Sequence, residues 1–397
     1  MSFFWQAERR KRRGRIKRIK KILCLFIIIF ILSQYDILSI MIDERVKKLA
    51  LILVDYSIKV KLKDKVFVSC SDPLGLPLAK EVYKLVLKKG AYPFLMLGTE
   101  DLDYFTFKNA SLAQLKKKPE VLDFITDWLD KSIKIKAAKN DRALANISSE
   151  RILLRQKAVR GILNKQIKKP WVITYYPTAS MAQSAGMSLD ELEDFYFSSC
   201  LQDWGKIKLK LLKVKKIMDK AKKVEIKGYK TNLSFSLKGR LSRVAAGECN
   251  MPDGEIFSAP LDGTMNGEIY FDFPSLHSGK VVKGIFLKFK EGKVVRASAL
   301  QNEIHLKKVL KTDIGASRPG EFAIGANYGI KKAILNTLFD EKIGGTIHLA
   351  LGKAYEEKEG GGINKSSIHW DLVKDMRKKG SQVIIDGKTV LKDGKIF

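Results

Sequence analysis

Two short segments near the C-terminus contain the residues best suited to chemistry. Residues 344–355 include His348 and Tyr355, and a little further on His369 and Asp371 form a His-x-Asp pair; the chain has only four histidines in all. Residues two apart on a β-strand point to the same face, so His369 and Asp371 are able to face one cation. Imidazole and carboxylate ligands together suit zinc, cobalt or manganese. The pair alone is weak evidence, because a surface strand carrying His and Asp is ordinary.

Glycine and glutamate occur together in two segments upstream of these histidines. The string Asn-Met-Pro-Asp-Gly-Glu ends at Glu255, and the string Gly-Glu-Phe-Ala-Ile-Gly-Ala-Asn begins at Gly320 and contains Glu321. Glycine allows backbone to approach a ligand closely. Simpler roles remain open for each residue: Glu255 as the cap of a turn, Glu321 as the cap of a helix begun at Gly320, and Tyr355 as a packed aromatic.

Four strings in a fixed order resemble the thermophilic metalloaminopeptidases of the aminopeptidase T, aminopeptidase S and PepS type. The resemblance runs from about Met41 to the C-terminus and leaves residues 1–40 outside it. The strings that carry it are Asn-Met-Pro-Asp-Gly-Glu-Ile-Phe-Ser-Ala-Pro at 250–260, Gly-Glu-Phe-Ala-Ile-Gly-Ala-Asn at 320–327, Asp-Glu-Lys-Ile-Gly-Gly-Thr-Ile-His at 340–348 and Ser-Ser-Ile-His-Trp-Asp at 366–371.

The resemblance implies a dinuclear site that holds two divalent ions, with zinc, cobalt and manganese all acceptable. Carried over residue by residue, the implied ligands are Glu255, Glu321, His348, His369 and Asp371, with Tyr355 at or beside the metals. Two metals are able to polarise a peptide carbonyl and to activate a water molecule. Glu321 would then accept the proton of that water, and Tyr355 would donate a hydrogen bond to the oxyanion.

The function implied by the resemblance is that of a metal-dependent aminopeptidase, which releases N-terminal residues from peptide substrates. The resemblance also implies a homodimer. An alternative from another class is a catalytically inactive metal-binding or membrane-associated protein of the same fold. The complete set of implied ligands counts against a loss of activity.

Composition restricts the remaining classes. The length of 397 residues and an apolar content of 45% allow two domains. The four cysteines are scattered and form no C-x-x-C pair, which fits a reducing compartment and, with the resemblance, a cytoplasmic protein. The net charge of +31 suggests nucleic acid, but most lysines alternate with apolar residues, as in 206–216. This alternation is typical of solvated faces, and no nucleic-acid recognition motif is present, so we predict no nucleic acid as a partner.

The first forty residues allow two interpretations. A basic block at 9–21 precedes the eleven-residue apolar run Ile22–Leu32, an order that resembles a signal anchor. The run is shorter than the roughly twenty apolar residues that a spanning helix needs. Residues 22–40 would anchor the protein in a membrane under one interpretation. We favour the other, in which translation from an upstream start adds a non-functional extension, because Met41 begins an amphipathic helix.

The rest of the chain divides into two predicted domains. Residues 41–223 alternate helix and strand, which predicts an α/β domain with a mostly parallel sheet and a linking helix. Residues 224–397 contain strictly alternating strands and Asp-Gly or Glu-Gly turns, which predicts an α+β, mostly antiparallel catalytic domain that holds all the candidate ligands. The predicted strands are 65–70, 91–97, 132–138, 171–176, 231–238, 284–290 and 383–391, and the predicted helices are 44–57, 73–89, 119–129, 148–167, 187–200 and 201–223.

Overall fold

The computed structural model describes residues 43–140 and 142–397. Residues 48–397 form one compact unit, and of the chain before it only residues 43–47 are described. The predicted extension at 1–40, with its apolar run, therefore lies outside the described residues. No helix within the described ranges is both long enough and apolar enough to cross a bilayer.

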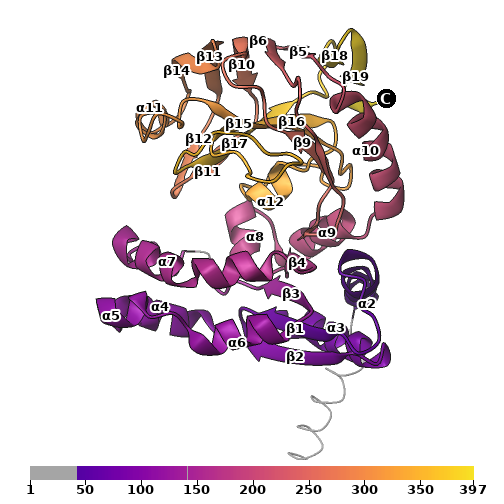
Figure 1. Ribbon diagram of the computed structural model, residues 1–397, viewed down its shortest axis with the longest axis vertical. Coiled ribbons are helices and arrows are strands. Elements are labelled where there is room, and N and C mark those ends of the chain that lie inside the picture. Colours follow the sequence, from indigo (N-terminus) through magenta and orange to yellow (C-terminus); the bar gives the residue numbers. More distant parts are fainter. Residues whose placement is uncertain (1–42, 141) are drawn as a thin grey trace, which may run out of the picture. The chain divides into compact units, whose positions relative to one another are not determined.

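The N-terminal region alternates helices with parallel strands, as the sequence predicts (Figure 1). Short π-helical and 3-10 segments, η1 and η2, precede β1 and α3. In chain order the elements are α2 (Glu44–Leu51), η1 (Ile52–Ser57), β1 (Lys65–Cys70), η2 (Pro73–Gly75), α3 (Leu76–Lys88), β2 (Tyr92–Leu97), α4 (Glu100–Asn109), α5 (Leu112–Lys116), α6 (Glu120–Trp128), β3 (Lys131–Lys136), α7 (Ser149–Gln166), β4 (Trp171–Tyr175), α8 (Ala179–Ala185), α9 (Leu189–Cys200) and α10 (Trp204–Met218).

Local sequence explains where several of these helices begin. Ser188 and Glu191 form a capping box at the start of α9, in which each side chain bonds the other residue's backbone N–H. Ser148 caps α7, and Asp203 caps α10. The predicted helix at 201–223 is therefore shorter than expected, because Asp203 starts it and a strand already begins at Lys223.

The parallel sheet has the order β2-β1-β3-β4-β8, and every neighbouring pair in it is parallel. Its last strand, β8 (Asn250–Met251), comes from the later part of the chain and pairs with β4. The sequence did not predict this strand, because two residues are too few to carry a periodic pattern. The domain division at residue 223 stays a prediction.

The C-terminal region is mostly antiparallel. Its elements besides β8 are β5 (Lys223–Gly228), β6 (Thr231–Ser236), β7 (Arg243–Ala245), β9 (Glu255–Ser258), β10 (Asn266–Phe271), β11 (Ser275–His277), β12 (Lys280–Val282), β13 (Ile285–Lys290), β14 (Lys293–Ser298), α11 (Glu303–Val309), β15 (Pro319–Gly325), α12 (Thr337–Asp340), β16 (Thr346–Gly352), β17 (His369–Asp375), β18 (Gln382–Ile385), β19 (Lys388–Lys392) and β20 (Lys395–Ile396). The eight-stranded sheet has the order β14-β13-β10-β6-β5-β18-β19-β20, and the five-stranded sheet has the order β17-β16-β15-β9-β7. The predicted fold class, α/β followed by mostly antiparallel α+β, is confirmed.

One predicted strand is two strands. The alternating segment 383–391 is interrupted at Asp386 and Gly387, which both have positive φ and form the turn of the β18–β19 hairpin. An Asp-Gly pair with positive φ at both positions is the preferred sequence of a two-residue hairpin turn. The alternating pattern of 383–391 correctly predicted β structure, but the turn within this segment was not predicted.

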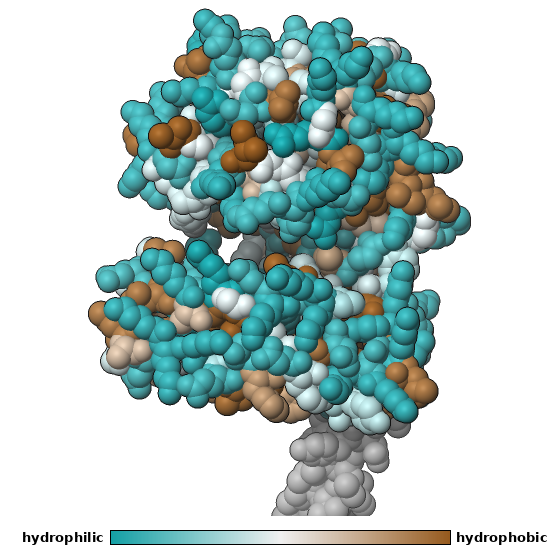
Figure 2. All heavy atoms as spheres, in the orientation of Figure 1, coloured by the Kyte–Doolittle hydropathy of each residue, from teal (hydrophilic) through white to brown (hydrophobic). Residues whose placement is uncertain are grey.

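The two antiparallel sheets share one hydrophobic core. Phe322 of β15 is fully buried, and its ring packs edge to face on Phe235 of β6, with centroids 5.1 Å apart. The same cluster includes Leu349, Leu372 and Ile285. By contrast, the face drawn in Figure 2 is mostly hydrophilic, with scattered hydrophobic side chains. The C-terminal region therefore has its apolar layer between sheets.

We predict that Phe322→Ala lowers the free energy of unfolding by about 3–5 kcal/mol, because it removes a buried ring and leaves a cavity. Urea denaturation measured by circular dichroism provides the comparison with the parent chain. Ile304→Ala is the matched control: its side chain is 87% exposed, so its effect should stay within about 0.5 kcal/mol. Equal effects for the two variants would contradict the assignment of Phe322 to the core.

Candidate metal centre

The five-stranded sheet separates two kinds of side chain by strand alternation. Residues of one face, including Ile256, Phe322 and Ile347, belong to the hydrophobic core. Successive residues on a strand point to opposite faces, so the polar residues beside them face away from the core. The candidate ligands all lie on this second face: Glu255 on β9, Glu321 on β15, His348 on β16, and His369 and Asp371 on β17.

Small residues lie between the polar ones on this face. Ala350 of β16 lies directly opposite both Glu321 and Asp371, in one row across three strands. Ala323 lies opposite His348 in the next row. A methyl group takes up little of the space above the sheet, so the long polar side chains are able to bend over it toward one another.

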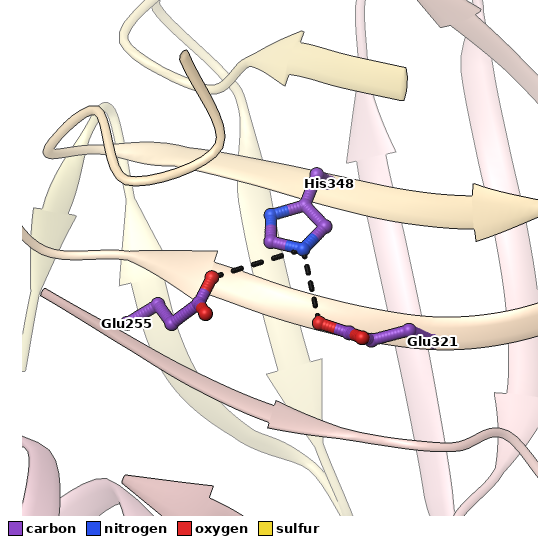
Figure 3. Close-up of side chains that lie close together, drawn as sticks. All are labelled: Glu255, Glu321 and His348. Carbon is purple, nitrogen blue, oxygen red and sulfur yellow. Dashed lines mark hydrogen bonds and ion pairs between the residues drawn. The ribbon is translucent and has the colours of Figure 1, made fainter. Parts of the chain in front are cut away.

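The first cluster consists of Glu255, Glu321 and His348, whose side chains turn toward one another (Figure 3). The Nε2 atom of His348 lies 3.1 Å from Glu321 Oε1 and 3.8 Å from Glu255 Oε2. All three residues are buried, with at most 4% of their surface exposed. The expectation that glutamates distant in sequence converge on His348 agrees with this geometry.

The second part of the site is formed by β17. Asp371 Oδ1 lies 3.3 Å from His369 Nε2 and 3.8 Å from His348 Nε2. Glu321 connects the two parts, since its Oε2 lies 3.9 Å from His369 Nε2. The His-x-Asp pair therefore faces the same side, as its spacing predicts, and both members lie next to the buried cluster.

Both histidines are oriented by backbone carbonyl groups. His348 Nδ1 lies 3.2 Å from the carbonyl oxygen of Glu341, and His369 Nδ1 lies 2.7 Å from that of Lys353. A nitrogen that donates to a carbonyl carries the ring proton, which leaves the Nε2 lone pair of the neutral ring free. A hydrogen bond from the other ring nitrogen to a carbonyl oxygen usually orients an imidazole that binds metal.

The glycine before each glutamate has a steric reason. Gly254 has φ +116°, a conformation that L side chains rarely adopt. A Cβ atom on Gly320 would lie only 2.3 Å from the carbonyl oxygen of Gly352. Gly320 also lies in a register shift between β15 and β16, so Glu321 follows a bulge. The interpretation of Glu321 as a helix cap is wrong, because Glu321 lies within a strand.

Electrostatics within the cluster favour bound cations. Burial raises the pKa of Glu255 to about 8, although Lys342 acts in the opposite direction. Burial alone would lower the pKa of His348, but its hydrogen bond to Glu321 and the nearby carboxylates raise it to about 10. Burial is likewise outweighed at His369, where Asp371 raises the pKa to about 10. At neutral pH and without metal, protons on these groups balance the carboxylates.

Tyr355 lies at the edge of the site. Its ring packs against Phe257 and His369, with centroids 5.3 Å and 5.8 Å away. Burial and the charge of Glu321 raise the pKa of Tyr355, so its hydroxyl stays protonated and able to donate. Tyr355 is 43% exposed and the His369 side chain 31% exposed, whereas His348 is buried. The site is thus open at the His369 end and closed at the Glu255 end.

Three charged residues beside the site, Glu341, Lys342 and Asp253, were not predicted to belong to it. Glu341 joins His348 and Asp371 in a second group whose ligand atoms lie within 4.8 Å of one another. Lys342 bonds Glu255 and Glu341, and Asp253 lies beside it. The strings that contain them were noticed, but only burial distinguishes these charges from surface charges.

Comparison with known proteins identifies the family of the chain. The family description "thermophilic metalloprotease (M29)" matches residues 42–396. Aminopeptidase 2 of Geobacillus stearothermophilus is 38% identical over 162 residues, which are 37% of either chain. Aminopeptidase T of Thermus aquaticus is 35% identical over 159 residues, 36% of this chain and 37% of the relative. The aligned part of the chain thus spans little more than a third of the length of these relatives.

Two solved structures share the fold. AmpT from Thermus thermophilus superposes with a TM-score of 0.76 at 23% identity, over 89% of this chain and 99% of the other. A 2,5-dihydroxypyridine dioxygenase from Pseudomonas putida superposes with a TM-score of 0.56 at 12% identity, over 89% of this chain and 96% of the other. These similarities support the architecture, and the match over 42–396 supplies the identification. The resemblance seen in the sequence is confirmed: the chain belongs to the thermophilic metalloprotease (M29) family.

Proposed function

We propose that the protein is a metal-dependent aminopeptidase that releases N-terminal residues from peptides. The observation that carries this proposal is the convergence of buried carboxylates and Nε2 atoms on one face of the five-stranded sheet. Family membership supports metal-dependent proteolysis, and relatives named aminopeptidase support the exopeptidase activity.

The chemistry of the donor atoms fits divalent metal. Among the described residues, Glu255 Oε2, Glu321 Oε2 and Asp371 Oδ1 are buried and have no hydrogen-bond partner. Buried carboxylate oxygens are normally satisfied, so three orphaned ones at one place call for a cation. Histidine and carboxylate donors suit zinc, cobalt or manganese.

Two ions account for the donor set better than one. Glu255, Glu321 and His348 form one possible group, and Glu341, His348 and Asp371 form another. His348 has only one free lone pair, because its Nδ1 faces a carbonyl, so it serves one ion while His369 remains for a second. Two bound divalent ions would supply Lewis acidity for a peptide carbonyl and for an attacking water.

Proton transfer and stabilisation of the oxyanion are assigned to different side chains. In this proposal Glu321 accepts a proton from the water and returns it to the leaving amine. Its position between His348 and His369, with one carboxylate oxygen that has no hydrogen-bond partner among the described residues, supports this role. Tyr355, at the open end of the site, is placed to donate a hydrogen bond to a developing oxyanion. Glu341 is the rival proton acceptor, although one of its oxygens is engaged by Lys342.

The resemblance further supports a homodimer, a cytoplasmic location and peptide substrates, and we include these in the proposal. The alternative is a catalytically inactive metal-binding or membrane-associated protein of the same fold. Protein of residues 41–397 loaded with zinc, cobalt or manganese and offered leucyl-peptides decides between them. Metal binding without release of leucine would establish the inactive alternative.

We predict that Glu321→Gln lowers kcat by about 10²–10⁴-fold, since an amide cannot accept the proton. Steady-state hydrolysis of leucyl-peptides at saturating metal measures the loss, and metal analysis shows how much ion is retained. Glu120→Gln is the matched control, because its side chain is 80% exposed and distant in sequence from the site, and it should leave kcat unchanged. Wild-type turnover by Glu321→Gln together with loss in Glu341→Gln would transfer the role to Glu341.

We also predict that metal binding releases protons. Without metal, His348 and His369 have pKa values of about 10 and Glu255 about 8, so all three are largely protonated at neutral pH. A metal requires them deprotonated, so its apparent affinity rises as pH increases from 6 to 8, by about tenfold per pH unit for each proton displaced. Titration calorimetry in buffers of different ionisation enthalpy counts the protons. A pH-independent affinity over this range would remove these residues from the ligand set.

A further inference from the structure

A buried lysine contacts the candidate metal centre. The side chain of Lys342 is only 2% exposed, and it lies directly after Glu341 in sequence. Lysine is almost never fully buried unless it is paired, because removing an ammonium group from water is costly. A lysine in this position therefore needs an explanation from its partners.

The partners of Lys342 are carboxylates of the site. Its Nζ donates to Glu255 Oε1, lies 2.7 Å from Glu341 Oε1, and lies 3.9 Å from Asp253 Oδ1. Glu255 and Glu341 belong to the two different ligand groups that share His348. One ammonium group thus connects both parts of the donor set.

The contact to Glu255 determines which of its oxygens is available. Oε1 accepts from the ammonium group, whereas Oε2 is buried, has no hydrogen-bond partner among the described residues and lies 3.8 Å from His348 Nε2. If Lys342 were absent, the carboxylate would be free to rotate about its terminal bond, whose torsional preference is broad. Lys342 therefore holds Glu255 with a single oxygen directed at the site.

The backbone fixes the lysine itself. Its N–H donates to the carbonyl oxygen of Phe339 at 3.1 Å, and its carbonyl accepts from Asn327 N–H at 3.0 Å. The fully buried Asn327 also donates through Nδ2 to the carbonyl oxygen of Asp253, at 2.9 Å. The segments that carry Lys342, Asp253 and Glu255 are thus connected by hydrogen bonds, so the ammonium group has a defined position relative to the carboxylates.

We propose that Lys342 is a positioning residue of the metal centre, which presents Glu255 through one oxygen and offsets the repulsion among the carboxylates before metal binds. This inference rests on the proposed metal site. The lysine does not ligate metal, because its ammonium group contacts Glu255 and Glu341 and has no lone pair. Its effect reaches the metals through Glu255 and Glu341.

The test compares the metal affinity of the folded wild-type protein with that of the folded Lys342→Met variant, measured by chelator competition and calorimetry. Methionine keeps an unbranched stem without the charge, and we expect the metal affinity of this variant to fall by about 10–100-fold, as is usual when a residue that holds a metal ligand in place is removed. Lys342→Arg keeps the charge and should recover part of this loss. Lys307→Met is the matched control, because Lys307 also pairs with a glutamate but is 53% exposed; its metal affinity should equal wild type.

A second measurement separates positioning from catalysis. At saturating metal, Lys342→Met should regain most of its kcat, since the ligands themselves are intact; a loss of kcat that metal does not restore would mean that the lysine acts on substrate and would overturn the proposal. If the methionine variant does not fold without metal, Lys342→Gln, which keeps one donor group, is used for the same measurements.

The outcomes distinguish this inference from the proposed function. Wild-type metal affinity in folded Lys342→Met, with or without lower stability of the metal-free protein, would overturn the positioning role and leave the metal site standing. Failure of every Lys342 variant to fold even with metal would also overturn it, because the lysine would then serve the fold. If instead Glu321→Gln and His348→Ala both bind metal as tightly as the wild-type protein, the proposed metal centre is contradicted.

Discussion

The alternation of side chains along four neighbouring strands is the constraint on which the site depends. On one face Phe322, Leu349 and Leu372 are buried in the shared core, and on the other face their immediate neighbours Glu321, His348 and Asp371 converge. A slip of one residue in the register would move every side chain to the opposite face, placing carboxylates in the core. The burial energy that selects the register therefore also assembles the polar face, and the site needs no separate device to bring distant segments together.

The polar face is costly to the fold, because it concentrates carboxylates where water is largely excluded. Ionised groups in such a place require partners, and three kinds of cation are able to supply them: protons, the ammonium group of Lys342, and metal. The raised pKa values of Glu255 and His348 describe the metal-free case, in which protons balance part of the negative charge. In the proposed metal centre, metal would replace those protons, whereas the ammonium group of Lys342 would stay in place. This difference explains why one fixed cation and several titratable groups coexist around the same carboxylates.

The sequence was sufficient for what depends on local pattern or on resemblance. Periodicity predicted β1 to β4 of the parallel sheet, several later strands and several helices, but not the strands that carry the candidate ligands. The capping box of Ser188 and Glu191 at the start of α9 is a signal of the same local kind, because it lies within four residues. The His-x-Asp pair followed from spacing, whereas Glu255, Glu321 and His348 were assembled only through the family strings. Lys342 and the short strand β8 were not predictable, since their roles arise from contacts with residues far away in sequence. A lysine between a glutamate and an isoleucine looks like a surface residue until its burial is known.

The fold alone does not define the reaction. A dioxygenase with 12% identity shares the architecture at a TM-score of 0.56, so the same sheets are compatible with different chemistry. What argues for metal-dependent proteolysis is the family match over residues 42–396, and the donor set fits the metal that this family uses. At the buried end, Glu255 and His348 are almost completely buried, whereas His369 and Tyr355 are partly exposed. Under the proposed function, a substrate would approach from the exposed side, past Tyr355 and His369, while the buried charges around Glu255 and Lys342 lie behind them.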